Sequence, residues 1–155
     1  MPAQPTKDKA IGVIVYFEFP RSTKYLIVKH KKGHWSFAKG HKEKDESSIQ
    51  TARRELYEEA GIKEVEFLAK KILAREKYFF SDRNKGKVKK VVSYFIAKSG
   101  TSKIRIDNKE IINYKWCTLN AADRILTYRQ SRKIIKKVDV LIRNKKSKNL
   151  KKVIK

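Results

Sequence analysis

The sequence is short of several residue types, and each shortage narrows the class of protein. Only one of the 155 residues, Cys117, is a cysteine, so no disulfide can form within the chain and an oxidising compartment gains no support. The apolar neighbours of Cys117 predict that it is buried in a strand. No run approaches the roughly 20 apolar residues that span a bilayer, and the first residues lack the apolar core of a signal peptide. We therefore expect a cytoplasmic protein with no membrane partner.

Acidic residues are also scarce, at 16 Asp and Glu against 40 Lys and Arg, which gives a formal net charge of +24. Such a chain attracts polyanions, and the attraction weakens as salt rises. Nucleotides, RNA, polyphosphates and anionic membranes all carry suitable charge. Residues 143–155 hold seven basic residues and no acidic one. We expect residues 1–142 to form one domain and residues 143–155 to form a solvated basic tail.

Several of the few carboxylates lie in one stretch, residues 40–62, with the sequence GHKEKDESSIQTARRELYEEAGI. Glu55, Glu58 and Glu59 fall at positions i, i+3 and i+4, so they share one face if the stretch is a helix. Like charges placed in this way repel, and carboxylate oxygens are the ligands that suit Mg²⁺ or Mn²⁺. We predict a helix that holds a divalent cation. The alternative is an amphipathic helix with a solvated acidic face.

The ends of this helix are marked by the residues that commonly begin and end helices. Asp45 and Ser47 are both candidates for the N-cap, and Gly61 is suited to the left-handed conformation that ends a helix. Between them, an apolar stripe at helical spacing predicts packing against a core. The stripe consists of Ile49, Ala52, Leu56 and Ala60.

Two further features of the stretch have predicted roles. Arg54 points about 100° around the helix from Glu55, so it can reach back to Glu46, and we assign this pair a structural role. Gly40 ends the loop that leads to the helix, where the backbone turns sharply or approaches a bulky group. Its carbonyl oxygen is a candidate for a further metal ligand.

Taken together, the stretch resembles the sequence box of the Nudix hydrolases. That box requires Gly, five residues, Glu, seven residues, Arg-Glu, an aliphatic residue, any residue, Glu-Glu, any residue, Gly and an aliphatic residue. Every required position is met, by Gly40, Glu46, Arg54, Glu55, Leu56, Glu58, Glu59, Gly61 and Ile62. The resemblance implies a Nudix fold, an α/β/α sandwich with a mixed β-sheet and a catalytic loop and helix. It also implies metal-dependent hydrolysis of a phosphoanhydride bond.

The string GHWSFAKGH, just before the box, is similar to that of the diadenosine tetraphosphate hydrolase branch, where a strand with tryptophan leads into Lys-Gly-His. Lys39 and His41 flank the acidic stretch, so they are candidates for neutralising polyphosphate oxygens. A solvated basic loop is the alternative for both residues. Glu110, in KEIINYKW, resembles a further carboxylate that the family places near the closing strand, as a metal ligand or general base. A glutamate on a surface loop is the alternative there.

Other segments alternate between strand and helix patterns. Strands are predicted at residues 10–19, 25–29, 75–80, 88–98 and 113–119, an extended segment at 65–74, and helices at 121–130, capped by Asn120, and after Ser131. Residues 1–9 are expected to be a loose lead-in. Among the aromatic residues of the hairpin 75–98, we expect Phe79 and Phe95 in the core. One tyrosine, Tyr78 or with slight preference Tyr94, is expected to stack on a base.

The family resemblance implies that Mg²⁺ ions held by Glu55, Glu58 and Glu59 screen the polyphosphate and activate a water that attacks phosphorus. Glu58, Glu59 or Glu110 takes the proton of that water, and the sequence does not choose among them. The favoured substrate is diadenosine tetraphosphate, split into ATP and AMP. The alternatives are an RNA 5′-pyrophosphohydrolase or decapping enzyme, and a non-catalytic module that binds nucleotides or RNA. Nothing in the sequence determines the oligomeric state.

Overall fold

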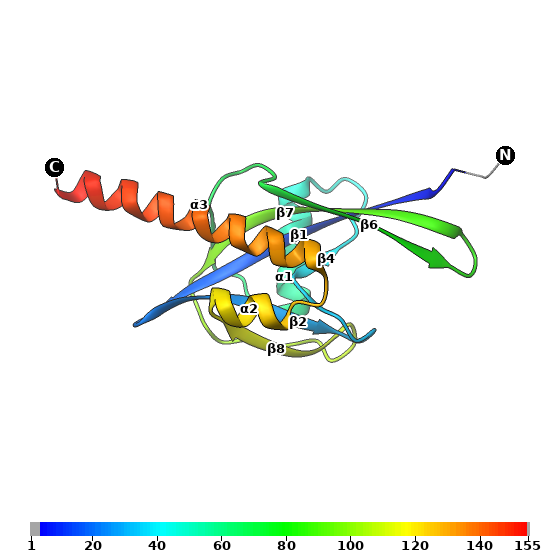
Figure 1. Cartoon of the computed structure of the whole chain (residues 1–155), viewed down its shortest axis with the longest axis horizontal. Coiled ribbons are helices and arrows are strands. Elements are labelled where there is room, and N and C mark those ends of the chain that lie inside the picture. The colour runs from blue at the N-terminus through cyan, green and yellow to red at the C-terminus, as the bar shows by residue number, and fades with distance from the viewer. Residues whose placement is uncertain (1–3, 155) are drawn as a thin grey trace.

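The structure is a computed structural model that describes the backbone of residues 4–154 and the side chains of residues 4–149. A twisted mixed sheet lies between one helix, α1, on one face and two helices, α2 and α3, on the other (Figure 1). The elements in chain order are β1 (Thr6–Phe19), β2 (Ser22–His30), β3 (Trp35–Ser36), β4 (Ala38–Gly40), α1 (Ser48–Ala60), β5 (Val65–Phe67), β6 (Ala74–Asp82), β7 (Gly86–Ser99), β8 (Ile111–Cys117), α2 (Leu119–Ile125) and α3 (Arg129–Ile154). The α/β/α sandwich predicted from the sequence is confirmed.

β1 lies at the centre of the sheet because it has three neighbours at different points along its length. It pairs in parallel with β7 from Thr6 to Tyr16, and antiparallel with β2 at its carboxyl end and with β4 at residues 11–13. β6 and β7 form the predicted hairpin. The amino end of β1 runs beside this hairpin, and the three strands project together from the body of the molecule (Figure 1).

Alternating residues of β1 and β7 enter two separate cores, one on each face of the sheet. The core beneath α2 and α3 includes Ile14, Tyr94 and Ile135. The core beneath α1 includes Val13, Leu56 and Phe95. α1 packs its apolar stripe against the sheet. Its carboxylates Glu55 and Glu59 therefore lie beside this stripe and approach Glu110, and the candidate site lies there.

Several sequence predictions need correction. β1 already begins at Thr6, because residues 6–9 pair with β7, so residues 6–9 of the expected loose lead-in are strand; residues 1–3 lie outside the described residues. Of the extended segment 65–74, only Val65–Phe67 and Ala74, where β6 begins, are strand. Phe79 is 55% exposed and does not belong to the core, whereas Phe95 is buried as predicted. Cys117 is buried at the end of β8, as expected.

The carboxyl-terminal helices also differ from the prediction. α2 is capped by Thr118 rather than Asn120, since the Thr118 hydroxyl accepts the backbone N–H of Ala121 at 3.3 Å. α3 continues without a break past residue 143, so the described part of the expected solvated tail is helical. Arg143 pairs with Asp139 at 2.8 Å within that helix. Lys155, the last residue of the predicted tail, lies outside the described residues. No helix in the described part of the chain is long and apolar enough to cross a membrane.

Candidate active site

Helix α1 is fixed at both ends by the residues that the sequence suggested. Ser47 is the N-cap and forms a capping box with Gln50, in which each side chain bonds the backbone N–H of the other. Gly61 ends the helix in the left-handed conformation, with φ of 72°, as predicted. Asp45, the other N-cap candidate, instead adopts a positive φ of 66° in the preceding loop. These caps set the rotation of α1 and therefore the direction of its carboxylates.

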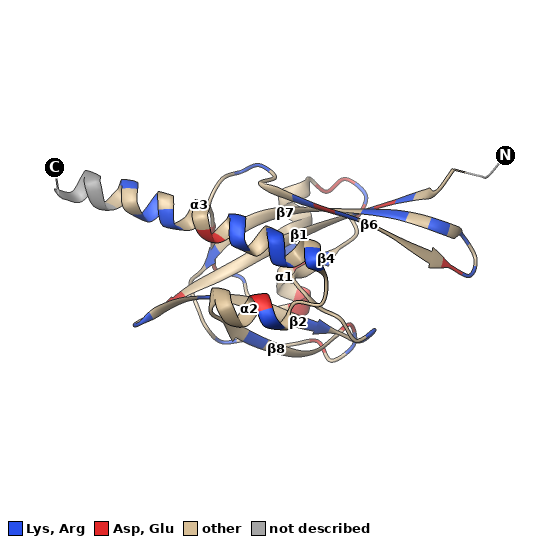
Figure 2. Cartoon of the chain, viewed as in Figure 1, with Lys and Arg blue, Asp and Glu red and all other residues tan. Residues whose placement is uncertain are grey.

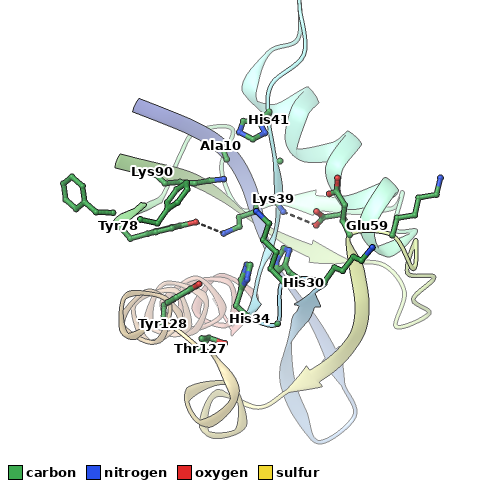
Figure 3. Close-up of a pocket in the computed structure, with 18 residues that line it drawn as sticks. Ala10, His30, His34, Lys39, His41, Glu59, Tyr78, Lys90, Thr127 and Tyr128 are labelled. Carbon is green, nitrogen blue, oxygen red and sulfur yellow. Dashed lines mark hydrogen bonds between the residues drawn. The ribbon is translucent and has the colours of Figure 1, made fainter. Parts of the chain in front are cut away.

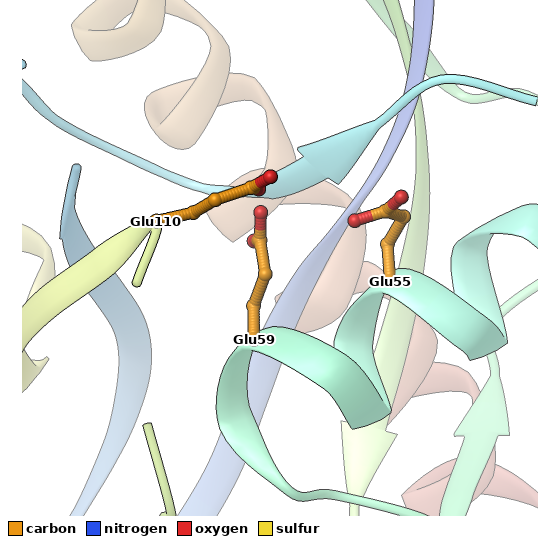
Figure 4. Close-up of side chains that lie close together, drawn as sticks. All are labelled: Glu55, Glu59 and Glu110. Atoms are coloured by element: carbon orange, nitrogen blue, oxygen red, sulfur yellow. The ribbon is translucent and has the colours of Figure 1, made fainter. Parts of the chain in front are cut away.

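Three carboxylates converge at one point between α1 and the loop before β8 (Figure 4). Glu55, Glu59 and Glu110 each offer an oxygen, and these oxygens lie within 4.8 Å of one another. Glu55 and Glu59 are buried, whereas Glu110 is exposed. The loop that carries Glu110 is held by Asp107, whose carboxylate accepts the backbone N–H groups of Lys109, Glu110 and Ile111 at 3.0 to 3.1 Å. The cluster therefore combines helix residues with a carboxylate from far along the chain.

Burial changes the protonation of the two helix carboxylates. Burial, with the neighbouring Glu55 second, raises the pKa of Glu59 from 4.5 to about 9. Burial likewise raises the pKa of Glu55 to about 7, although Arg54 opposes the shift. Without a cation, these groups therefore hold protons at neutral pH that exposed carboxyls would lose. A cation among them would reverse this preference by favouring the charged forms.

The surroundings of the cluster fit a divalent cation. One buried oxygen of Glu59, Oε1, has no hydrogen-bond partner among the described residues, which is unusual for a buried polar atom and leaves a lone pair available. A Cβ built on Gly40 would lie 2.1 Å from the Glu55 carboxylate, so only glycine leaves space for that group beside the backbone. Several carboxylate oxygens this close together are typical ligands for hard cations such as Mg²⁺.

We expect the stability of the chelator-treated protein to fall as pH rises from 7 to 9. Over most of this range Glu59, whose folded-state pKa is about 9, keeps its proton in the folded chain and has lost it in the unfolded chain. The folded state therefore binds more protons, and each rise in pH favours unfolding. His30 and His34, whose pKa values burial lowers to about 3 and about 4, are neutral in both states above pH 7. Thermal unfolding in EDTA, repeated with saturating Mg²⁺ and with Glu59→Gln, measures the effect. Saturating Mg²⁺ and Glu59→Gln should each flatten the dependence of stability on pH. A flat dependence for the metal-free wild type would contradict the prediction.

Arg54 connects the loop before α1 to the carboxylates of the helix. Its guanidinium donates two hydrogen bonds to Glu46, at 2.7 and 3.1 Å, which confirms the predicted pair. It also donates to Glu55 at 2.9 Å, to Glu58 at 3.2 Å and to the carbonyl oxygen of His41 at 2.8 Å. Arg54 therefore does not point away from Glu55, as its helical position suggested, because its long side chain bends back across the start of the helix.

Replacement of Arg54 by alanine should lower the melting temperature by several degrees and also reduce activity. The first effect follows because Glu46, whose pKa the Arg54 hydrogen bond holds down at about 2, loses its main partner. The second follows because Glu55 loses one of the contacts that orient it. Thermal unfolding and steady-state kinetics measure both effects. Arg54→Lys, which keeps the charge but not the bidentate geometry, is the control, and an unchanged melting temperature would show that the pair has no structural role.

A cleft of about 1060 Å³ opens beside the carboxylate cluster (Figure 3). One end is lined by Glu59, Glu110 and Gly40, and the other by aromatic side chains. Its walls carry the lysines Lys31, Lys32, Lys39, Lys90 and Lys109. The volume is at the upper end of the range for small-molecule sites, and the cationic walls suit an extended anion such as a polyphosphate.

Lys39 contacts residues at both ends of the cleft. Its backbone N–H donates to Glu59 at 3.2 Å, and its ammonium group lies 3.5 Å from the hydroxyl of Tyr78 (Figure 3). The Lys39 side chain is largely buried, and burial lowers its pKa, so an anion in the cleft would be a favourable partner for its charge. The ring of Tyr78 is stacked on that of Tyr128 at 5.7 Å and 17°, so two aromatic faces lie together near Lys39.

The remaining predicted site residues have different surroundings. His41 lies at the rim of the cleft, and its Nε2 is 2.7 Å from Asp8, so its contact with a substrate stays a prediction. Glu58 is half exposed and paired with Arg54, outside the cluster of three, and its role as a ligand also stays a prediction. The preference for Tyr94 as the base-stacking residue is wrong. Its ring is fully buried against Phe37, so no base can reach it.

Sequence reasoning missed three contributors to the cleft. Tyr128 lies between two helices, and nothing near it in the sequence links it to Tyr78, because their stacking depends on how α3 packs on β6. The rings of His30 and His34 are stacked at 4.3 Å on the cleft wall, and the tight turn between them brings them together. The sequence did contain a signal for the stacked histidines, since His30 and His34 are four residues apart on either side of Gly33.

Comparison with known proteins agrees with this geometry. A family model described as the NUDIX domain matches residues 7–138. The asymmetrical bis(5′-nucleosyl)-tetraphosphatase of Caenorhabditis elegans is 27% identical over 136 residues, which cover 86% of this chain and 96% of that protein. The family model therefore spans α1 and the Glu110 loop, and the match to the relative covers nearly all of that protein.

Solved structures give the same result. The crystal structure of a C. elegans Ap4A hydrolase binary complex matches with a TM-score of 0.74 and 26% identity, covering 88% of this chain and 98% of that one. The NUDIX domain of Shewanella oneidensis NrtR, solved with ADP-ribose, matches with a TM-score of 0.68 and 18% identity, over 92% and 90% of the two chains. The second likeness concerns the fold alone, since its sequence identity is low.

Proposed function

The chain belongs to the Nudix family and is a pyrophosphohydrolase, and from this premise we propose that its substrate is diadenosine tetraphosphate, split by one water into ATP and AMP. The observation that carries this proposal is the position of Lys39, whose backbone bonds a cluster carboxylate and whose ammonium group reaches the stacked tyrosines. A polyphosphate that passes Lys39 would have its phosphates beside the cluster and an adenine beside Tyr78 and Tyr128. The asymmetrical tetraphosphatase relative supports the same substrate.

We propose that Glu55, Glu59, Glu110 and the Gly40 carbonyl hold Mg²⁺, with Glu58 as the further ligand that the sequence box implies. When bound, the cation supplies positive charge against the polyphosphate and activates water for attack on phosphorus. Mn²⁺ has the same preference for oxygen ligands and is the alternative. The raised pKa values of Glu55 and Glu59 support this role, since a cation is what would keep two buried carboxyls charged at neutral pH.

The protein groups have separate roles in this reaction. Lys39 neutralises a phosphate oxygen beside the cluster, and the tyrosine pair positions a base, which holds the scissile bond in place. Glu110 is the one cluster carboxylate exposed to solvent, so it is the group that water can reach, and we assign it the role of general base. Lys31 and Lys32 also line the cleft, and we assign them the remaining phosphates of the substrate.

Hydrolysis of a set of substrates with Mg²⁺ tests the proposal. The set contains diadenosine tetraphosphate, diadenosine triphosphate, a nucleoside triphosphate and an RNA with a 5′-triphosphate. We expect diadenosine tetraphosphate to have the highest kcat/KM and to give equal amounts of ATP and AMP, because Lys39 and the base site fix the distance from adenine to the attacked phosphorus. Formation of ADP alone would contradict the asymmetrical position. Cleavage of the RNA alone would replace the proposal with the 5′-pyrophosphohydrolase alternative.

A further inference from the structure

The projecting part of the sheet has a second, basic face that the proposed hydrolysis does not use. Residues in register on neighbouring strands share a face, and the next residue along each strand lies on the opposite one. One row across β1, β7 and β6 is Lys7, Lys89 and Phe79, and the adjacent row on the same face is Lys9, Val91 and Lys77. The row between them, Asp8, Lys90 and Tyr78, lies on the opposite face, where Lys90 and Tyr78 line the cleft.

We define the basic face by its seven charged and aromatic residues. They are Lys7, Lys9, Arg75, Lys77, Phe79, Lys87 and Lys89. No carboxylate occupies a described strand position on this face between these residues. None of its six cations forms an ion pair within residues 4–149, whereas Lys90 on the cleft side pairs with Asp8 at 3.2 Å. Figure 2 shows Lys and Arg along these projecting strands. The face is therefore a concentration of unneutralised positive charge.

Phe79, which also borders the cleft, gives this face a feature that charge alone does not explain. Its side chain is 55% exposed, although burial of a phenylalanine normally stabilises a fold. The Lys87 ammonium group lies 4.9 Å from the centre of the ring, and Lys89 is directly opposite it in the register. An exposed ring surrounded by lysines, spaced about 7 Å apart along each strand, is suited to stack on one base while neighbouring phosphates meet the cations.

We propose that the basic face binds single-stranded RNA. A paired base hides its flat surface within the duplex, so an exposed ring selects an unpaired strand. An acidic protein segment would satisfy the lysines but would not require the ring. The choice of RNA over DNA rests on the proposed function, in which the cleft on the other side of the same strands takes a polyphosphate attached to the 5′ carbon of a ribose. RNA is the polynucleotide whose first residue can carry such a group.

Binding of a short single-stranded RNA with a 5′-hydroxyl end, measured in EDTA by fluorescence anisotropy, tests this proposal without any hydrolysis. Phe79→Leu should weaken binding roughly five- to 150-fold, because it keeps an apolar side chain but removes the ring, whereas Phe79→Tyr should bind like the wild type. Lys7→Gln with Lys9→Gln should reduce the slope of log affinity against log salt by about 1.4, which is about 0.7 for each lost phosphate contact.

The matched control is Lys133→Gln with Lys137→Gln, which removes the same charge from exposed positions on α3, on the opposite side of the sheet. It should leave the salt slope unchanged. An equal effect of the two lysine pairs would overturn the proposal in favour of attraction by the whole protein, as would equal binding by Phe79→Leu and wild type. Equal affinity for duplex RNA would also overturn the proposal. So would a Phe79→Leu variant that loses binding to anionic lipid vesicles but keeps binding to RNA. Because the RNA lacks a phosphoanhydride, these results stand apart from the substrate tests.

Discussion

Glu59→Gln should lower kcat by about a thousandfold or more, a rise of about 4 kcal/mol in the activation barrier. Glu59 is the most buried of the three clustered carboxylates, and its Oε1 has no other partner among the described residues. Glutamine has the same shape and can still accept the Lys39 N–H bond, but its neutral amide cannot replace a carboxylate as a cation ligand. The measurements are steady-state kinetics on diadenosine tetraphosphate and the Mg²⁺ dependence of thermal unfolding.

The stability of the Glu59→Gln variant, measured with chelator and with Mg²⁺, is the control for this prediction. Because Glu59 has a raised pKa, the neutral side chain should not destabilise the chelator-treated protein at pH 8, and it should abolish the stabilisation by Mg²⁺. Glu58→Gln is the comparison, since the sequence box includes Glu58 among the ligands although its side chain is half exposed beside Arg54. If Glu58→Gln lowered kcat as much as Glu59→Gln, Glu58 would have to turn toward the cluster when the cation binds. Activity within tenfold of wild type for Glu59→Gln would refute the metal assignment.

The sequence was sufficient to predict the parts of the site that depend on local geometry. Helical spacing alone places Glu55 and Glu59 on one side of α1, and the cap residues mark where the helix begins and ends. The Arg54 to Glu46 pair could also be predicted, since eight residues across a helix start are within reach of an arginine. For Glu110, the sequence supplied only a resemblance. Its proximity to Glu59 comes from the packing of the β8 loop against the end of β2, where the Lys31 N–H bonds the Glu110 carbonyl.

Other features could not be predicted because they depend on which face of a strand is covered. Tyr78 and Phe79 are adjacent in sequence and both border the cleft, yet the Tyr78 ring stacks on Tyr128 inside it whereas the Phe79 ring is 55% exposed on the opposite face of the strand. Only the register with β7 decides between the two faces. Tyr94 is followed by a phenylalanine, as Tyr78 is, but it lies where α3 covers the sheet. The continuous α3 was also missed, since a run of lysines is typical of both a solvated tail and the exposed face of a helix.

Substitution of Gly40 and of Gly12 by alanine should have different effects, the first on activity and the second on stability. A Cβ on Gly40 would lie 2.1 Å from the carboxylate carbon and Oε1 of Glu55, which are the far end of a flexible side chain. A Cβ on Gly12 would lie 2.6 Å from the backbone oxygen of Ala38 and 2.6 Å from the ring of Tyr94. Neither of these can move without disturbing the central sheet, since Gly12 pairs with Lys39 between β1 and β4.

We therefore expect Gly40→Ala to remove most activity while leaving the fold nearly as stable as wild type. Glu55 can rotate away from the new methyl group, but it then leaves the cluster that it forms with Glu59 and Glu110. The loss of kcat should approach that of Glu55→Gln, and stabilisation by Mg²⁺ should weaken in parallel. Gly12→Ala should instead lower the melting temperature strongly, because the clash is with backbone and with a fully buried ring.

The pair is informative because the same chemical change, one added methyl group, is made on two paired strands of one sheet. Comparison of kcat per folded molecule with the melting temperature distinguishes the two outcomes, and near-ultraviolet circular dichroism reports on packing around the buried tyrosine. Should Gly40→Ala retain activity within tenfold of wild type, Glu55 would not need its present position, and the carboxylate cluster would not be the catalytic metal site. Should it unfold as readily as Gly12→Ala, the space beside Gly40 would serve the fold rather than the carboxylate that fills it.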